Sequence, residues 1–220
     1  MALGLGQNQN NGWTDHGDIA AIDGATVLTL AFWVAGGPVV SAGEWRKGNI
    51  RLFEMGGDRS YQLREVGVWQ LNSDADAVPA DVTSWNHFAV VYDGSLAAAN
   101  RMTVYKNAVA LTLSGSTPGT SLSSTSPNTL QCGNVNVSGK IGHVRLWSAA
   151  LTQAEVEQEV HRYWASRRTN LLIDSPYDDA LWAMDYSGTG NHGTPDQANG
   201  VPSQEQGPPV GYGATVLVTG

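Results

Sequence analysis

The most regular hydrophobic pattern in the chain is an alternation over residues 26–34. Leu28, Leu30, Phe32 and Val34 fall on one face at a period of two, and the opposite face is also largely apolar. A strand with one face in water would carry polar residues at every second position. The pattern therefore predicts a β-strand that is buried on both sides.

Several shorter segments show the same period and are separated by turn-forming residues. They predict strands over residues 50–55, 61–66, 68–71, 87–92, 101–106 and 141–147. The Ser- and Thr-rich tract 114–127 has no such alternation, and we expect it to be a surface loop. Strands and turns in this order predict an all-β fold.

A helical pattern follows the last of these strands. Thr152 and Glu155 have the spacing of a capping box, and Leu151 can pack against Val156 as a hydrophobic staple. One face of the helix would then carry Val156, Val160, Tyr163 and Trp164. A short helix gains its stability from packing, so we expect this face to cover the sheets.

These patterns together predict one hydrophobic core shared by two sheets and the helix. The residues expected in it are Leu30, Phe32, Val90, Val104, Leu146, Val156 and Val160. Trp33, Trp85 and Trp147 lie on predicted strands and are also expected in the core.

The composition changes after Arg168. Residues 169–220 contain no Lys or Arg, six acidic residues and five of the nine prolines. We therefore predict a sandwich domain over residues 1–165 and an extended, acidic, Pro- and Gly-rich arm over residues 166–220. Either the arm packs on its own chain, with 185–194 beside the N-terminal strand, or it packs on a neighbouring copy or capsid subunit.

Charge and cysteine content narrow the possible partners. Twelve Lys and Arg against twenty Asp and Glu give a net charge of −8, which disfavours nucleic acid. Cys132 is the only cysteine, so no internal disulfide is possible. The first basic residue is Arg46, so no signal peptide is expected. No stretch approaches the ~18 to 20 apolar residues that a membrane helix requires, so no membrane partner is expected.

Four segments resemble the laminin G-like domains of the concanavalin A-like lectin-glucanase superfamily. They are residues 85–94 (Trp-Asn-His-Phe-Ala-Val-Val-Tyr-Asp-Gly), 104–107, 139–147 and 150–156. The resemblance implies a jelly-roll sandwich of two antiparallel sheets with one short C-terminal helix and an extended tail.

One hairpin departs from the family pattern. Relatives usually have Asn-Gly where this chain has Asn107 and Ala108. Ala108 would cost about 1 kcal/mol at positive φ, so a turn of another type is an alternative.

The tail contains Asp-Tyr-Ser-Gly-Thr-Gly-Asn-His-Gly-Thr at residues 185–194, similar to a segment that precedes the first strand in many relatives. Its C-terminal position resembles phage-encoded and metagenomic members. This resemblance implies a protein of the virion surface, made in the host cytoplasm.

Catalytic motifs are missing from the sequence. The Glu-x-Asp-x-x-Glu pattern of sandwich glycosidases does not occur, and Glu155, Glu157 and Glu159 are interpreted as a solvated helix face. There is no Gly-x-Ser-x-Gly elbow, and no Cys-x-x-Cys or His-x-x-x-His that would indicate zinc. We therefore predict that the chain is not an enzyme.

Binding sites have two sets of candidates. Asp15, Asp18, Asp58 and Asp93 are loop-placed carboxylates that could hold calcium, although each is also a typical turn former. For a glycan, the candidates are the tryptophans with polar neighbours in sequence, which could also be packed at the core's edge: Trp13, Trp45 and Trp69.

Three functional hypotheses follow. The first is a non-enzymatic virion-surface structural protein, a capsid decoration or fibre-like module of a phage, which self-associates as a homo-oligomer and binds another virion protein. The alternative is a carbohydrate-binding adhesion module with a glycan partner. The third is a glycan-cleaving enzyme. The fold alone does not separate them.

Overall fold

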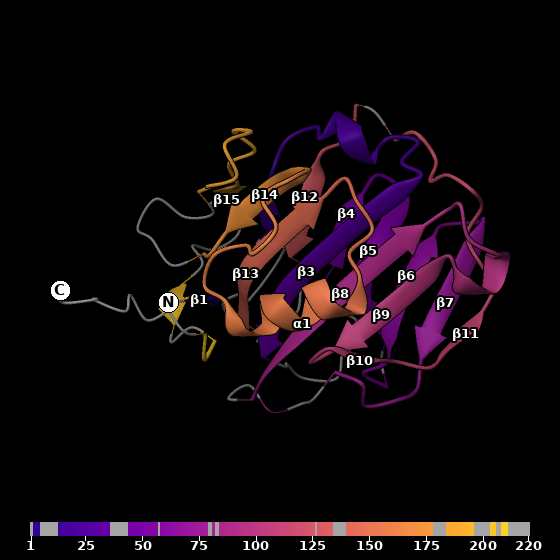
Figure 1. Ribbon diagram of the computed structural model, residues 1–220, viewed down its shortest axis with the longest axis horizontal. Helices are drawn as coiled ribbons and strands as arrows, with labels where there is room; N and C mark the ends of the chain where they lie inside the picture. The colour runs from indigo at the N-terminus through magenta and orange to yellow at the C-terminus, as the bar shows by residue number, and fades with distance from the viewer. Residues whose placement is uncertain are drawn as a thin grey trace, which may run out of the picture.

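The computed structural model describes residues 2–4, 13–35, 44–56, 58–78, 81, 84–125, 127–133, 140–177, 184–195, 203–205 and 208–210. Within these residues, two antiparallel sheets of eight strands each face one another (Figure 1). The predicted jelly-roll sandwich is confirmed. The α-helix α1 (Gln153–His161) and the 3₁₀ turns η1 (Ala20–Ile22) and η2 (Ala98–Asn100) complete the elements.

The first sheet has the strand order β10-β9-β8-β3-β13-β1-β16, and β14 also pairs with β13. Its strands are β10 (Val109–Ala110), β9 (Met102–Lys106), β8 (Trp85–Asp93), β3 (Val27–Ala35), β13 (Lys140–Trp147), β1 (Ala2–Gly4), β16 (Ser203–Glu205) and β14 (Leu171–Ser175). One edge of β13 is thus shared, since β1 pairs with its start and β14 with its end.

The second sheet has the strand order β11-β7-β6-β5-β4-β12-β2-β15. Its strands are β11 (Leu113–Gly115), β7 (Trp69–Ser73), β6 (Tyr61–Glu65), β5 (Ile50–Met55), β4 (Glu44–Lys47), β12 (Leu130–Gly133), β2 (Trp13–Asp15) and β15 (Thr194–Pro195). Within the predicted loop tract 114–127, only the start belongs to a strand, at the end of β11.

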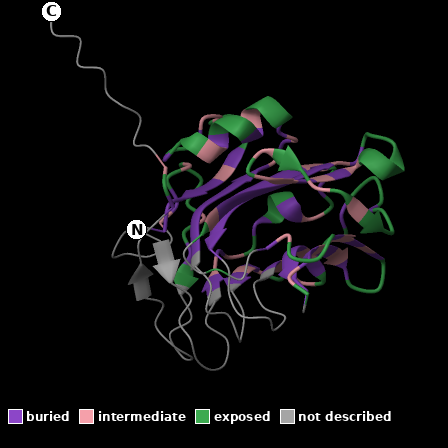
Figure 2. Ribbon diagram, turned by 90° about the horizontal axis from the view of Figure 1, so that it is seen from below, coloured by how far each residue is buried: buried purple, intermediate pink, exposed green. Residues whose placement is uncertain are grey.

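The core lies between the two sheets, where Figure 2 shows the buried strands facing each other. Phe32 of β3 is at its centre, with ring centroids 5.2 Å from Phe53 and 6.2 Å from Phe88. The five predicted core residues on strands are all buried here, which confirms the strand phases. Val156 is buried in a second cluster with Ala31 and Ala89, and Val160 is half-buried, so the prediction of a single core shared with the helix is wrong. Of the three tryptophans expected in the core, Trp33 and Trp147 are buried and Trp85 is half-buried.

The helix begins as predicted but turns a different face to the sheet. Thr152 and Glu155 form the capping box, and Val156 is buried. The next buried position is Glu159, so its interpretation as part of a solvated face is wrong. The reason is Arg145 on β13, whose guanidinium lies 2.5 Å from the Glu159 carboxylate and balances its charge.

Arg145 joins the helix, the following loop and β14 to the first sheet. Its side chain is buried and donates to Asp174 on β14 and to the carbonyls of Arg162 and Tyr163. Burial raises the pKa of Asp174, although Arg145 opposes the shift. A buried Arg with several partners stabilises this packing only while all of them are present.

The helix ends at His161, earlier than its apolar pattern indicates. Arg162 is extended, so Tyr163 and Trp164 lie beyond the last turn and point in different directions from the helical face. Tyr163 is buried, whereas Trp164 is 46% exposed. The prediction that Trp164 packs on the sheets is therefore wrong.

The described part of residues 166–220 packs on its own sandwich. β14 pairs with β13, β15 pairs with β2 at Thr194 and Asp15, and β16 pairs with β1. These are the contacts of the own-chain alternative for the tail. The expected boundary at residue 165 falls a few residues before a strand of the first sheet, and Trp182 and Tyr212 lie outside the described residues.

The hairpin that has Asn107 and Ala108 in place of Asn-Gly keeps the geometry of the Asn-Gly form. Asn107 and Ala108 have φ of 50° and 65°, and Lys106 pairs with Val109 across a two-residue loop. Positive φ at both central residues is the type I′ turn. The alternative of another turn type is wrong, and Ala108 carries the backbone strain.

Candidate functional site

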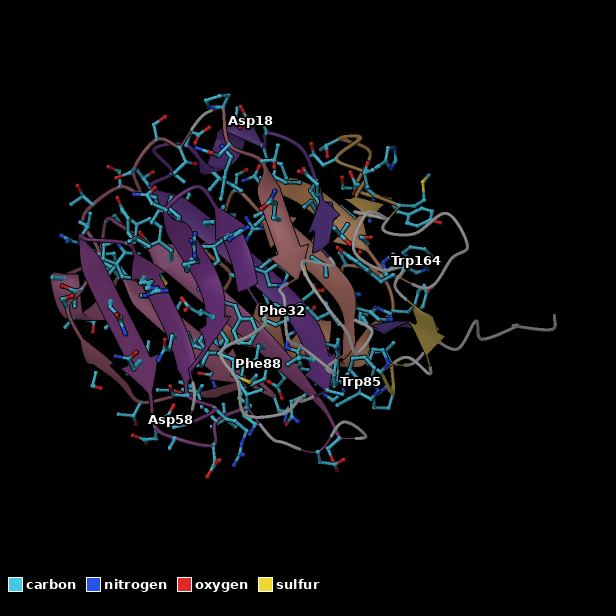
Figure 3. The ribbon with its side chains drawn as sticks, turned by 180° about the vertical axis from the view of Figure 1, so that it is seen from behind. Asp18, Phe32, Asp58, Trp85, Phe88 and Trp164 are labelled. Atoms are coloured by element: carbon cyan, nitrogen blue, oxygen red, sulfur yellow. The ribbon has the colours of Figure 1, made fainter. Side chains whose placement is uncertain are left out.

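The two faces of the second sheet differ sharply in polarity. Along β6 and β7 every second residue is buried in the core, while Gln62, Arg64, Gln70 and Asn72 point outward and are half-buried. Figure 3 views this outward face from the side opposite α1, which lies on the first sheet. The outward face of the second sheet is therefore polar, and the described helix leaves it uncovered.

The strand registers bring polar residues from seven strands into one cross-strand row. The row runs from β15 to β7 as Thr194, Asp15, Gln131, Arg46, Arg51, Arg64 and Gln70. We call it the polar row. Strands are spaced about 4.8 Å apart, so the row extends over roughly 29 Å. It offers guanidinium, amide, carboxylate and hydroxyl groups side by side.

Neighbouring side chains of the row hold one another in place. Arg46 Nε donates to Gln131 Oε1 at 3.0 Å, and the Asp15 carboxylate accepts from Thr129 Oγ1 at 2.7 Å. Arg64 donates to Glu54 at 2.7 Å. Groups fixed in this way lose less side-chain entropy when a ligand binds.

A pocket of about 520 Å³ lies where the polar row reaches β2. The residues lining it are Asp15, His16, Gly17, Asp18, Gly190, Asn191, His192 and Thr194. Asp15 and Thr194 belong to both the pocket and the row, so the two features are continuous. The pocket volume is within the range of small-ligand sites, and its lining is mainly polar.

One wall of the pocket is the loop 185–194, which is organised around Asp185. The Asp185 carboxylate accepts from the backbone N–H of Asp174 and Ser187 and from the hydroxyl of Thr189. Burial acts to raise the pKa of Asp185, but these hydrogen bonds outweigh it and lower the pKa. Ser187, Thr189 and Asn191 of this segment are thus partners of a single carboxylate.

His16 fixes this wall to the sandwich, and His192 stabilises the loop from within. His16 Nδ1 donates to the Asn191 carbonyl, and Tyr177 donates its hydroxyl to His16 Nε2 at 2.7 Å. Burial lowers the pKa of His16 and keeps the ring neutral. His192 accepts the Asp185 N–H at Nδ1, which leaves Nε2 as a hydrogen-bond donor.

The tryptophans selected from the sequence do not provide a stacking surface in the described residues. Trp45 is fully buried beside Phe32 and His16, and Trp69 is buried with its indole donating to Glu65. The interpretation of these two as exposed ligand-binding residues is wrong. The side chain of Trp13 lies outside the described residues.

The four calcium candidates are not brought together. Asp15 and Asp18 line the pocket, and Asp18 is 2.7 Å from the Lys47 ammonium; Asp58 lies at the opposite end of the sheet from Asp18 (Figure 3). Asp93 accepts from Ser95 in a local turn. In the part of the chain that the structure describes, no group of three His, Cys, Asp or Glu is placed to hold a metal. Calcium binding stays a prediction.

The histidines of the first sheet are buried and neutral. Burial lowers the pKa of both His87 and His143 to about 3, with Arg145 adding to the shift. His143 has a φ of 49° at the bulge in β13, and its ring packs on Tyr163. Across the described ranges, no helix is long and apolar enough to span a bilayer.

A comparison of the whole sequence with protein families identifies the superfamily. The model of the concanavalin A-like lectin/glucanases superfamily, in its laminin G form, matches residues 8–157. The chain belongs to this superfamily. The match covers strands of both sheets and most of α1, in agreement with the resemblance found in residues 85–156. No protein with a curated description matches the chain.

Solved structures show the same fold at low identity. A candidate carbohydrate-binding protein from Bacteroides ovatus ATCC 8483 aligns over 91% of this chain with 15% identity and a TM-score of 0.61. The chain spans about three fifths of that structure, 61% of its length. This likeness supports the fold.

Two further structures align less closely. A heptameric SAP-like pentraxin from Limulus polyphemus is 15% identical over 71% of this chain and 79% of its own, with a TM-score of 0.46. Domain 4 of the Geobacillus stearothermophilus arabinanase AbnA, solved with arabinotriose, is 14% identical over 63% and 68%, with a TM-score of 0.46.

Proposed function

We propose that the chain is a carbohydrate-binding module without catalytic activity, and that it binds an oligosaccharide along the polar row of the second sheet. The observation that carries the proposal is the row itself, in which donors and acceptors from seven strands share one face that the described helix does not cover. Sugar hydroxyls both donate and accept, so they match mixed guanidinium, amide and carboxylate groups. The length of the row suits several sugar units.

The pocket lies at the β15 end of the polar row. Asp15 and Asp18 supply acceptors, and His192 supplies a donor at Nε2. We infer that this pocket takes one sugar unit of the oligosaccharide bound along the row, because Asp15 and Thr194 belong to both the pocket and the row. The similarity to the Bacteroides ovatus structure, itself a candidate carbohydrate-binding protein, supports this ligand class over a virion-surface role.

A glycan array with the full chain tests the proposal. Arg64→Ala/Gln70→Ala removes two adjacent members of the row, and each lost hydrogen bond is worth roughly 0.5–1.5 kcal/mol. We expect at least tenfold weaker binding of any array ligand, measured by titration calorimetry. Glu157→Ala/Gln153→Ala, on the exposed side of α1, is the matched control and should bind normally.

Two results would contradict the proposal. One is a wild-type chain that binds no saccharide on the array with or without calcium. The other is a bound saccharide that the chain hydrolyses, which would favour an enzyme. Copurification with assembled phage particles, in the absence of glycan binding, would favour the virion-surface structural role.

A further inference from the structure

Two aromatic side chains lie exposed side by side on the molecule. Trp164 is 46% exposed and Tyr186 is 42% exposed. Their ring centroids are 5.2 Å apart, and the ring planes meet at 72°. The other exposed large apolar side chains of the described residues are aliphatic: Val66, Val68, Leu96 and Val109. We call Trp164 and Tyr186 the aromatic corner.

The backbone on both sides of the corner is firmly anchored. The carbonyl of Tyr163, next to Trp164, accepts from the buried guanidinium of Arg145 at 2.5 Å. Tyr186 donates its N–H to the Asp174 carbonyl at 2.9 Å, and its own carbonyl accepts from Arg168. The two rings are thus presented by a rigid frame, so little ordering is needed on binding.

The surroundings of the corner are polar. Within the described neighbouring segments 162–168 and 184–190, the exposed positions other than the two rings are Arg162, Arg168, Gly188, Thr189 and Gly190. Arg168 has half of its side chain exposed. A stable protein–protein interface buries about 800 Å² on each partner, with an apolar centre. Two rings in a polar setting are too small for that and fit a ligand of about one ring.

We propose that the aromatic corner is a second saccharide-contact site, separate from the polar row. A pyranose ring has one face rich in C–H groups, which stacks on an indole and leaves its hydroxyls at the edge. Tyr186, nearly perpendicular to Trp164, bounds the sugar on one side. Arg168 donates to the Tyr186 carbonyl, and Thr189 is an exposed polar residue three positions after Tyr186. The ligand class rests on the proposed function, while the site does not.

Fluorine NMR of the chain labelled with 5-fluorotryptophan tests the corner directly. Loss of one signal in Trp164→Phe assigns the Trp164 resonance. The probes are methyl β-D-glucopyranoside, cellotetraose, xylotetraose and any saccharide bound on the array. We expect a saturable shift of the Trp164 signal with at least one probe, and at least fivefold weaker saturation in Tyr186→Ala. Val109→Ala, an exposed apolar position on a hairpin, should leave the titration unchanged.

The same titration in Arg64→Ala/Gln70→Ala separates the two sites. A Trp164 shift that persists in this variant supports the corner even if the polar row fails. If a ligand binds through the polar row but does not shift the Trp164 signal, the corner alone is overturned. The corner is also overturned if no probe shifts the Trp164 signal. A Trp164 signal that responds to protein concentration and not to sugar would instead identify a contact between copies, contrary to the proposal.

Discussion

The outward face of the first sheet is covered by α1, whereas that of the second sheet is polar. On the first sheet, the small residues Ala31 and Ala89 lie in one buried cluster with Val156 of α1. On the second sheet, the equivalent positions carry Arg, Gln and Asn and face outward. Both sheets already share one core through their inner faces. The helix therefore adds stability on the outer face of the first sheet, whereas no described helix covers the outer face of the second sheet.

The strongest test of this comparison is the buried Arg145. Arg145→Ala leaves the buried Glu159 without its charge partner and Asp174 with only the half-exposed Arg168, so we expect a loss of about 3–5 kcal/mol in the free energy of unfolding. Urea denaturation measures it. Arg64→Ala on the open face should cost about 1 kcal/mol or less. Equal losses at the two positions would contradict the division of roles.

The covered face should also carry the acid sensitivity. His87 and His143 have folded pKa values of about 3 and an unfolded value of about 6.5, so their stabilisation is complete above pH 6.5 and falls as the pH drops towards 3. From pH 7 to 5 each should remove about 2 kcal/mol. Urea midpoints across this range measure the slope.

His87→Gln/His143→Asn is the variant for that slope, since Asn tolerates the positive φ at residue 143. Its stability should depend less steeply on pH by about two protons in this range. An unchanged slope would mean that other groups account for the acid sensitivity.

A smaller effect is expected from filling the space beneath the helix. Ala31→Leu adds three carbons to a fully buried position and should destabilise by about 1–3 kcal/mol, measured by thermal melting. Gln70→Leu on the open face should change stability by about 0.5 kcal/mol or less. A neutral Ala31→Leu would show that α1 moves freely on the sheet.

The smallest predicted change concerns the β9–β10 hairpin. Ala108→Gly relieves a left-handed residue in the type I′ turn and should stabilise the chain by about 1 kcal/mol. Denaturant midpoints check it. Ala110→Gly, on the same hairpin at a strand position, is the control and should not stabilise. Destabilisation by Ala108→Gly would disprove strain at this turn.

Strand positions followed from the sequence because a period of two reports burial directly, as in residues 61–65 and 69–73, where buried and half-buried positions alternate. The burial of Trp45 was not predicted, and the same period of two explains why. Its neighbours Glu44 and Arg46 are polar, but adjacent residues of a strand point to opposite faces. Polar neighbours in sequence therefore say little about whether a strand tryptophan is buried.

The polar row depends on strand-pairing registers that cannot be predicted from a single sequence. Arg46 faces Arg51 and Arg51 faces Arg64 only because bulges shift the pairing on both sides of β5. Glu159 was misread for a similar reason, since its partner Arg145 lies on another element. Trp164 was assigned to a helical face because the apolar period continues beyond His161, where the backbone turns.

The pairing of β1 with β16 has a consequence for biosynthesis. Ala2 is opposite Glu205, and Thr14 is opposite Pro195, so β1 and β2 find these partners only after β16 and β15 have been translated. At 5–20 residues per second the ribosome needs roughly 10–40 s to supply them. During that interval β2 has an open edge, and β13 has its own until β14 emerges. Chaperones that shield strand edges should therefore have their greatest effect on the yield of this chain before β14, β15 and β16 have been translated.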